Sequence, residues 1–116
     1  LVKIWKYDTA REMWLQSGSD IAGDSNSAWF GKAITLSADG NRIAISSSTG
    51  VRVLQFVQTL WGDWSQLGQM IVDHYVSRGI VMTADGSRLA VYDDTGNTKL
   101  IRLYDLEISS SSTRLQ

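Results

Sequence analysis

The sequence contains no cysteine and no proline, and it has a single histidine among its 116 residues. Without cysteine the chain forms no disulfide, offers no thiolate nucleophile and lacks the common cysteine-ligated zinc sites. Without proline, nothing removes a backbone donor from a β-sheet, while ten glycines open the backbone angles that tight turns need. The composition therefore favours many short strands joined by glycine turns, and it leaves the cellular compartment open.

A strong net charge and a long apolar run are also missing. The formal charge is −1 and 43% of the residues are hydrophobic, which is ordinary for a globular domain and unlike a disordered or nucleic-acid-binding chain. No run approaches the roughly 18 apolar residues that a membrane helix needs. The start, Leu1–Trp5, resembles a strand more than a signal peptide. We expect no nucleic-acid partner and no membrane-spanning segment.

One stretch occurs twice, and the rest of the chain is organised around it. Ile34–Ile45 returns as Val81–Val91, with the same alanine, arginine and apolar pattern around an Asp-Gly pair. Asp-Gly is the dipeptide that most readily adopts a tight hairpin turn. One copy would be a generic β-hairpin, but two matched copies predict a repeat architecture of stacked units.

Other segments set the period of the repeat. Trp14–Ile21 matches Trp64–Ile71 fifty positions later, and Val51–Phe56 matches the strand that begins at Ile101 at the same spacing. The Asp-Gly turns are closer together, which predicts a loss of about four residues in a surface loop after Ile71. The expected organisation is about nine strands and no helix. The units comprise a partial one at 1–21, a full one at 30–71 and an incomplete one at 77–106, followed by a flexible polar tail at 107–116.

Four antiparallel strands in about 50 residues is the size of a β-propeller blade. The alternative all-β class, a sandwich, does not require the sequence to recur at a fixed period. We therefore predict an all-β fold of two consecutive four-stranded antiparallel blades plus a partial flanking blade. Loops should alternate between two rims, which places Trp29 on one rim and Asp39 on the other.

The core Leu36–Ile45, the strand Gly50–Val53 and the segment Trp64–Gly68 together resemble the WD40-like propeller repeats, whose pattern is LSxDGxRxAI, GxVRVY and WxQxG. The resemblance covers residues 2–106. It departs at 76–79, where Phe-Gly is expected, and at 54–56, where the usual Tyr is absent. The resemblance implies a propeller fold and favours a secreted or cell-surface protein, but such propellers host many unrelated roles.

No set of residues predicts catalysis. His74 lies in the shortened loop, and the Gly-x-Ser-x-Gly elbow that would accompany it in a hydrolase is absent. The acidic clusters at 20–26 and 93–97 lack the spacing of a calcium loop, and Asx turns explain both. We expect no enzyme activity, no metal and no cofactor.

Aromatic residues give the best candidates for binding. Trp14 and Trp64 share one repeat position, so we expect them to pack between units. Trp29 and Trp61 have no counterpart and lie in loops, which makes them the better candidates for contact with an external partner. Trp29 beside Asp24 and Asn26 has the composition of a sugar site. The predicted binding residues are Asp24, Asn26, Trp29, Trp61, His74, Tyr75, Asp93 and Asp94.

Two blades cannot close a ring, because propellers close with four to eight. We therefore expect a non-enzymatic protein-interaction or scaffold module within a larger protein or assembly, whose partners are other protein chains or further blades. The alternative is a propeller that binds a glycan or small ligand with loop residues on one rim. Bare apolar faces and incomplete units further predict that the isolated chain is not a stable monomer.

Overall fold

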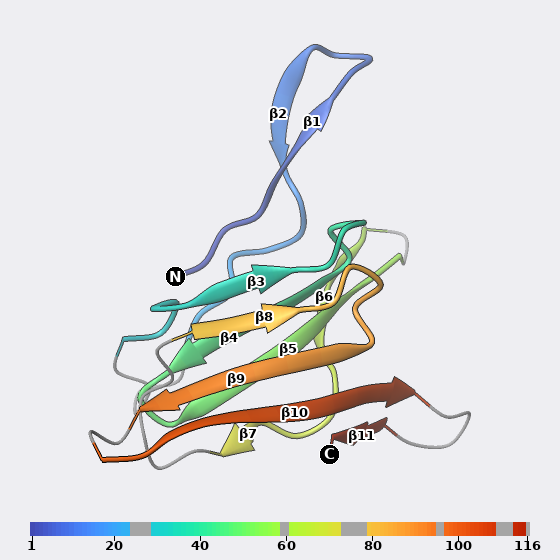
Figure 1. Ribbon diagram of the computed structural model, residues 1–116. Coiled ribbons are helices and arrows are strands. Elements are labelled where there is room, and N and C mark those ends of the chain that lie inside the picture. The colour runs from blue at the N-terminus through green and yellow to red at the C-terminus, as the bar shows by residue number, and fades with distance from the viewer. Residues whose placement is uncertain (24–28, 59–60, 73–78, 95–96, 109–112, 116) are drawn as a thin grey trace.

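The computed structural model describes residues 1–23, 29–58, 61–72, 79–94, 97–108 and 113–115 (Figure 1). These residues form eleven β-strands, all pairs are antiparallel, and the described part of the chain contains no helix. The all-β, antiparallel class predicted from the sequence is confirmed. No described helix could cross a membrane.

The first sheet contains the strands of the full repeat unit in chain order. Its path is β3-β4-β5-β6, and β7 pairs with the far end of β5. Apolar residues alternate between its two faces, because successive side chains of a strand point in opposite directions. The strands are β3 (Ile34–Leu36), β4 (Arg42–Ser47), β5 (Gly50–Val57), β6 (Asp63–Gln66) and β7 (Ile71–Val72).

The second sheet repeats this order as β11-β10-β9-β8. Its strands are β8 (Gly79–Met82), β9 (Arg88–Asp94), β10 (Lys99–Ile108) and β11 (Thr113–Leu115). The segment 107–116 was expected to be a flexible tail. In the structure β10 extends into this segment, and β11 pairs with β10. That pairing gives the second sheet a fourth strand, which the sequence repeat did not predict.

A two-stranded hairpin precedes both sheets. It consists of β1 (Trp5–Asp8) and β2 (Met13–Gln16), and it projects beyond the sheets (Figure 1). Below it, Val2 and Ile21 form an isolated antiparallel bridge that lies on the first sheet. The chain is therefore a stack of an N-terminal hairpin unit, the first sheet and the second sheet.

The two Asp-Gly turns have the same geometry, as predicted. Gly40 and Gly86 have φ angles of +74° and +75°. Asp39 Oδ1 accepts hydrogen bonds from Ser37 Oγ at 2.7 Å and from the Asn41 amide at 2.9 Å. Asp85 Oδ1 accepts hydrogen bonds from Thr83 Oγ1 at 2.8 Å and from the Ser87 amide at 2.9 Å. Each turn closes on itself by an Asx-type bond, so the dipeptide pattern specified it locally.

The tryptophans at the shared repeat position also match. Trp14 lies opposite Tyr7 in the hairpin, with ring centroids 5.3 Å apart at 73°. Trp64 lies opposite Phe56 in the first sheet, with centroids 5.3 Å apart at 70°. Such edge-to-face pairs across two strands stabilise a sheet by about 0.5–1.5 kcal/mol beyond the area they bury. The equivalence of β1–β2 and β5–β6 is therefore structural as well as sequential.

Loops at the two ends of the first sheet are placed as the repeat predicted. Trp29 lies at the end where Gly31 donates from its amide to Ser46 O at 2.9 Å. The Asp39 turn joins β3 and β4 beyond the Leu36–Ile43 pair, at the opposite end. Trp29 and Asp39 therefore do not share an end.

Three aspartates at loop ends should make folding sensitive to acid. Bonds from the Ser87 hydroxyl and amide and from the Thr83 hydroxyl lower the pKa of Asp85 from 3.8 to about 2. Amide and hydroxyl donors likewise lower the pKa values of Asp39 and Asp63. A lowered folded-state pKa contributes stability above the unfolded value and loses it as the pH falls through the folded value.

We expect the free energy of unfolding to fall as the pH drops from 3.8 toward about 2. Asp85→Asn should flatten this decline, because its side chain has no charge to lose. Urea denaturation of the wild type and the variant across that pH range measures the effect. An unchanged pH slope in the variant would contradict this assignment.

Candidate functional site

One packing arrangement occurs twice along the stack. In the first instance Val2 and Ile21 pack on Ile43, Ile45 and Leu54, which belong to one face of the first sheet. All five side chains are almost fully buried, with no more than 6% exposed. This contact joins the hairpin unit to the first sheet.

The second instance uses the residues at the equivalent repeat positions. Val51 and Val53, the counterparts of Val2 and Ile4, lie on the opposite face of the first sheet and pack with Leu89 and Val91 of the second. Leu89 and Val91 are in turn the counterparts of Ile43 and Ile45. Each unit thus offers a forward face to the next unit and a back face to the previous one.

Polar contacts reinforce the junction between the two sheets near their hairpin turns. The Ala38 amide donates to Ala84 O at 2.7 Å. Arg42 Nη1 donates to Gly86 O at 2.6 Å and to Leu106 O at 3.3 Å. A guanidinium satisfies two backbone carbonyls at once here, which fixes the stacking direction as well as the separation.

The forward face of the second sheet has no covering unit among the described residues. Its cross-strand row is Val81, Ala90 and Leu103, with Ile101 alongside. The matching row of the first sheet is Thr35, Ala44 and Val53. Val53 is 1% exposed, whereas Val81, Ile101 and Leu103 are 66–70% exposed. We call Val81, Ala90, Ile101 and Leu103 the open face.

Charged residues border the open face. Arg88, the counterpart of Arg42, places its Nε 3.0 Å from Asp105 Oδ1 and is 64% exposed. A shallow hollow of about 290 Å³ lies between the apolar side chains, lined by Val81, Ala90, Leu103 and their neighbours. An apolar centre with a polar border is the usual composition of a protein-binding surface.

No family model, no curated protein and no solved structure matches this chain.

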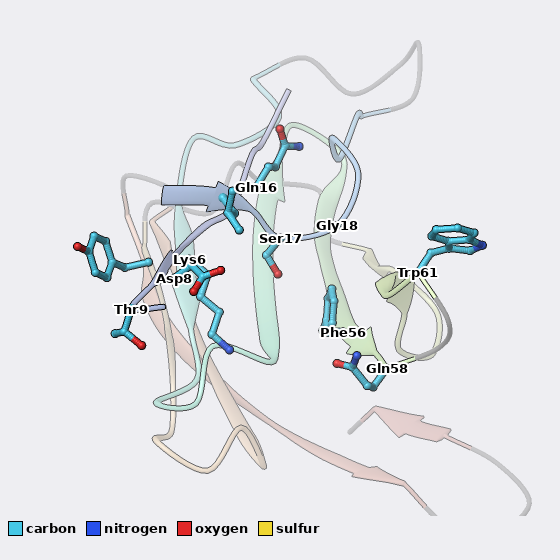
Figure 2. A pocket seen from close by; sticks show the side chains of 11 residues that line it. Lys6, Asp8, Thr9, Gln16, Ser17, Gly18, Phe56, Gln58 and Trp61 are labelled. Carbon is cyan, nitrogen blue, oxygen red and sulfur yellow. The ribbon is translucent and has the colours of Figure 1, made fainter. Parts of the chain in front are cut away.

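A cleft of about 500 Å³ lies between the β1–β2 hairpin and the β5–β6 end of the first sheet. Figure 2 shows Lys6, Asp8 and Thr9 on one side of it and Trp61 on the other, with Phe56 between them. The Trp61 side chain is 90% exposed. The lining of the cleft mixes aromatic rings with amide, hydroxyl and charged groups, so the cleft could hold a polar ligand that has an apolar face.

The predicted binding residues are not brought together at one place. Trp61 lies in the cleft, whereas Trp29 lies at the opposite end of the first sheet, where Lys32 Nζ is 4.9 Å from its ring centroid. Asp93 is 1% exposed and faces Arg102, whose Nε is 3.6 Å from Asp93 Oδ2, while Asp94 is half-buried. Asp24, Asn26, His74 and Tyr75 lie outside the described residues.

The sequence predicted bare apolar faces, but it did not locate the open face. Val81, Ile101 and Leu103 look like ordinary strand residues, because a two-residue alternation identifies a face but not what covers it. The repeat alignment held the missing signal. Since Val51 and Val53 correspond to Ile101 and Leu103, a search for repeat positions that lack a following unit would have found them.

The described residues contain no group of three or more histidine, cysteine, aspartate or glutamate side chains arranged to hold a metal ion. Asp39 and Asp85 lie together beside Asn41 and Arg42 in a polar hollow between the two turns. Their carboxylates already accept bonds from neighbouring hydroxyls and amides. The pair is therefore accounted for as turn structure.

Proposed function

We propose that this chain is a non-enzymatic protein-interaction module, a segment of a β-propeller that serves as a scaffold in a larger protein or assembly. The observation that carries the proposal is the open face. The contact of the hairpin unit with the first sheet and the contact of the first sheet with the second are both buried, and they use equivalent repeat positions. The open face has the repeat position of the forward faces in these contacts, but it is exposed. Apolar patches of this kind normally mark an interface.

The proposal includes the propeller geometry. The first sheet has five antiparallel strands, four of them in sequential order, and the second sheet has four in sequential order. The second sheet lies on the first with matched turns beside each other. In a propeller each such sheet packs face to face on the next around a central axis. The succession of back face and forward face supports this arrangement.

Insertion of further repeats tests the proposal. A second copy of residues 17–66 placed after Gln66 keeps the register, because Trp64–Gln66 then continues into Ser17 just as Trp14–Gln16 does. Each inserted unit adds one sheet and one interface, so the free energy of unfolding should rise with every unit. When the chain reaches between four and eight units, X-ray scattering should indicate a closed disc. The proposal would be contradicted if the particles stayed extended at every number of units, or if the free energy of unfolding did not rise with added units.

A second candidate function is favoured by the cleft at Trp61. An exposed indole can stack on the apolar face of a sugar while nearby amides such as Gln16 and Gln58 bind its hydroxyls. This function would occupy a surface distinct from the open face.

If the cleft binds glycans, Trp61→Ala should abolish binding and change the free energy of unfolding by less than about 0.5 kcal/mol, since the side chain is 90% exposed. Calorimetric titration with a panel of oligosaccharides measures this. Trp29→Ala is the comparison, because Trp29 is exposed at the other end of the sheet and should not affect binding in the cleft. Loss of binding in Trp29→Ala but not in Trp61→Ala would place the glycan site at Trp29, as its composition predicted. Absence of binding to the wild type by the whole panel would remove this candidate.

A further inference from the structure

A second exposed apolar surface lies at the other end of the stack, on the β1–β2 hairpin. Trp5, Tyr7 and Trp14 project from the same face of the hairpin, as their register requires. Their side chains are 53%, 44% and 62% exposed. We call these three residues the aromatic face.

The repeat identifies this surface as a back face. Trp5, Tyr7 and Trp14 correspond to Leu54, Phe56 and Trp64 of the first sheet. Leu54 is buried against Val2 and Ile21 of the unit before it. The Trp64 indole donates from Nε1 to Ser17 O at 2.8 Å, also in that preceding unit. The aromatic face is thus the kind of surface that, one unit later, is covered.

The two exposed ends are therefore the two halves of a contact that the chain already makes twice. The open face carries Ile101 and Leu103, the counterparts of Val2 and Ile4. From this relation we propose that the open face binds the aromatic face of a second copy of the chain, with Trp5 and Tyr7 lying on Ile101 and Leu103. The inference rests on the proposed function, since it names the partner of the same interaction surface.

A second copy offers two back faces that could bind the open face, one on the hairpin and one on the first sheet. The hairpin is favoured because its back face is exposed. Ile43 and Ile45 of the first sheet have the right repeat position, but the chain's own Val2 and Ile21 already cover them. The aromatic face is exposed without any rearrangement. The β1–β2 hairpin that carries it projects away from the sheets (Figure 1). A second copy can reach the open face with this hairpin alone.

Such a contact is heterologous, because it joins different surfaces on the two copies. Heterologous contacts build rings when the rotation closes and open filaments when it does not. The wild-type chain should therefore form dimers and larger species whose proportion increases with protein concentration. A contact of the open face with itself would stop at a dimer.

Two variants, each with one surface disabled, separate these possibilities. Leu103→Asp places a charge in the open face, and Trp5→Asp places one in the aromatic face. Replacement of a central apolar residue typically weakens the affinity of an interface about 30-fold or more. In sedimentation velocity each variant alone should remain monomeric where the wild type associates. Met13→Asp is the matched control, because Met13 is 48% exposed on the opposite face of the same hairpin and should leave association unchanged.

Mixing the two variants gives the deciding result. Leu103→Asp keeps an intact aromatic face and Trp5→Asp keeps an intact open face, so an equimolar mixture should form one-to-one dimers that grow no further. Circular dichroism and thermal melts of each variant establish that it is folded, and Trp14→Asp replaces Trp5→Asp if the latter is not.

A mixture that contains only monomers would overturn the proposal, as would a Leu103→Asp variant that associates like the wild type. If the mixture stays monomeric while chains with inserted repeats gain stability, the open face has a partner other than a second copy. The proposed function then stands and this inference does not.

Discussion

Val53→Asp should cost more than about 4 kcal/mol of unfolding free energy, whereas Leu103→Asp should change it by less than about 0.5 kcal/mol. The two residues occupy the same repeat position on β5 and β10. Val53 is 1% exposed between the two sheets, so an aspartate there would bury an unpaired charge. Leu103 is 68% exposed, so the same aspartate would remain in water.

Urea denaturation at low protein concentration, where association does not contribute, measures both values. Equal destabilisation by the two substitutions would mean that the open face is covered within the chain. Val53→Leu is a suitable control for the change of residue at the buried position, because overpacking alone costs about 1–3 kcal/mol.

Gly18→Ala should destabilise the chain by about 2–5 kcal/mol, more than the same change at Gly40. Both glycines have left-handed φ angles, +76° and +74°, which cost an alanine about 1–2 kcal/mol. At Gly40 a new Cβ would meet nothing within 4 Å, but at Gly18 it would lie 2.6 Å from Trp64 Cδ1. The additional cost at Gly18 is that of separating Trp64 from the hairpin unit.

Denaturation of the two glycine variants gives the comparison, and a double-mutant cycle with Trp64→Ala identifies the cause. If contact with the indole accounts for the excess, Gly18→Ala should cost less in the Trp64→Ala background than in the wild type. Additive effects would show that the backbone angle alone is responsible. Equal costs at Gly18 and Gly40 would contradict the packing described for Trp64.

The parts of the fold that the sequence predicted are those with a local cause. The Asp39-Gly40 and Asp85-Gly86 turns follow from the dipeptide, because the aspartate accepts bonds within its own turn. Strand order followed from the turns, since short connections make sequential neighbours. The shared position of Trp14 and Trp64 followed from the period alone.

What the sequence did not predict depends on distant partners. The segment of β11 looked like a flexible tail because four serines precede it, yet its pairing is supplied by the extension of β10 to Ile108. Trp14 was expected to pack between units, but it is 62% exposed because no sheet lies behind the hairpin among the described residues. A repeat position thus predicts which face a residue occupies, and a neighbouring unit decides whether it is buried.

The candidate site divides in the same way. Trp61 was identified because it lacks a counterpart in the other unit, and it does lie in a cleft. Bare apolar faces were predicted, but the open face was not located, because Ile101 and Leu103 do have counterparts and those counterparts are core residues. The residues of the open face resemble their core counterparts in size and polarity, and the two faces differ only in whether another unit covers them.

That the second sheet exposes the face that the first sheet buries is the central structural claim. Because the sequence contains no cysteine, a single thiol can report on it directly. Leu103→Cys and Val53→Cys chains should be labelled with a thiol reagent in dilute solution and their rates compared. We predict rapid labelling at position 103, slowing as the protein concentration rises, and strong protection at position 53 throughout. Equal protection at both positions in dilute solution would contradict the claim.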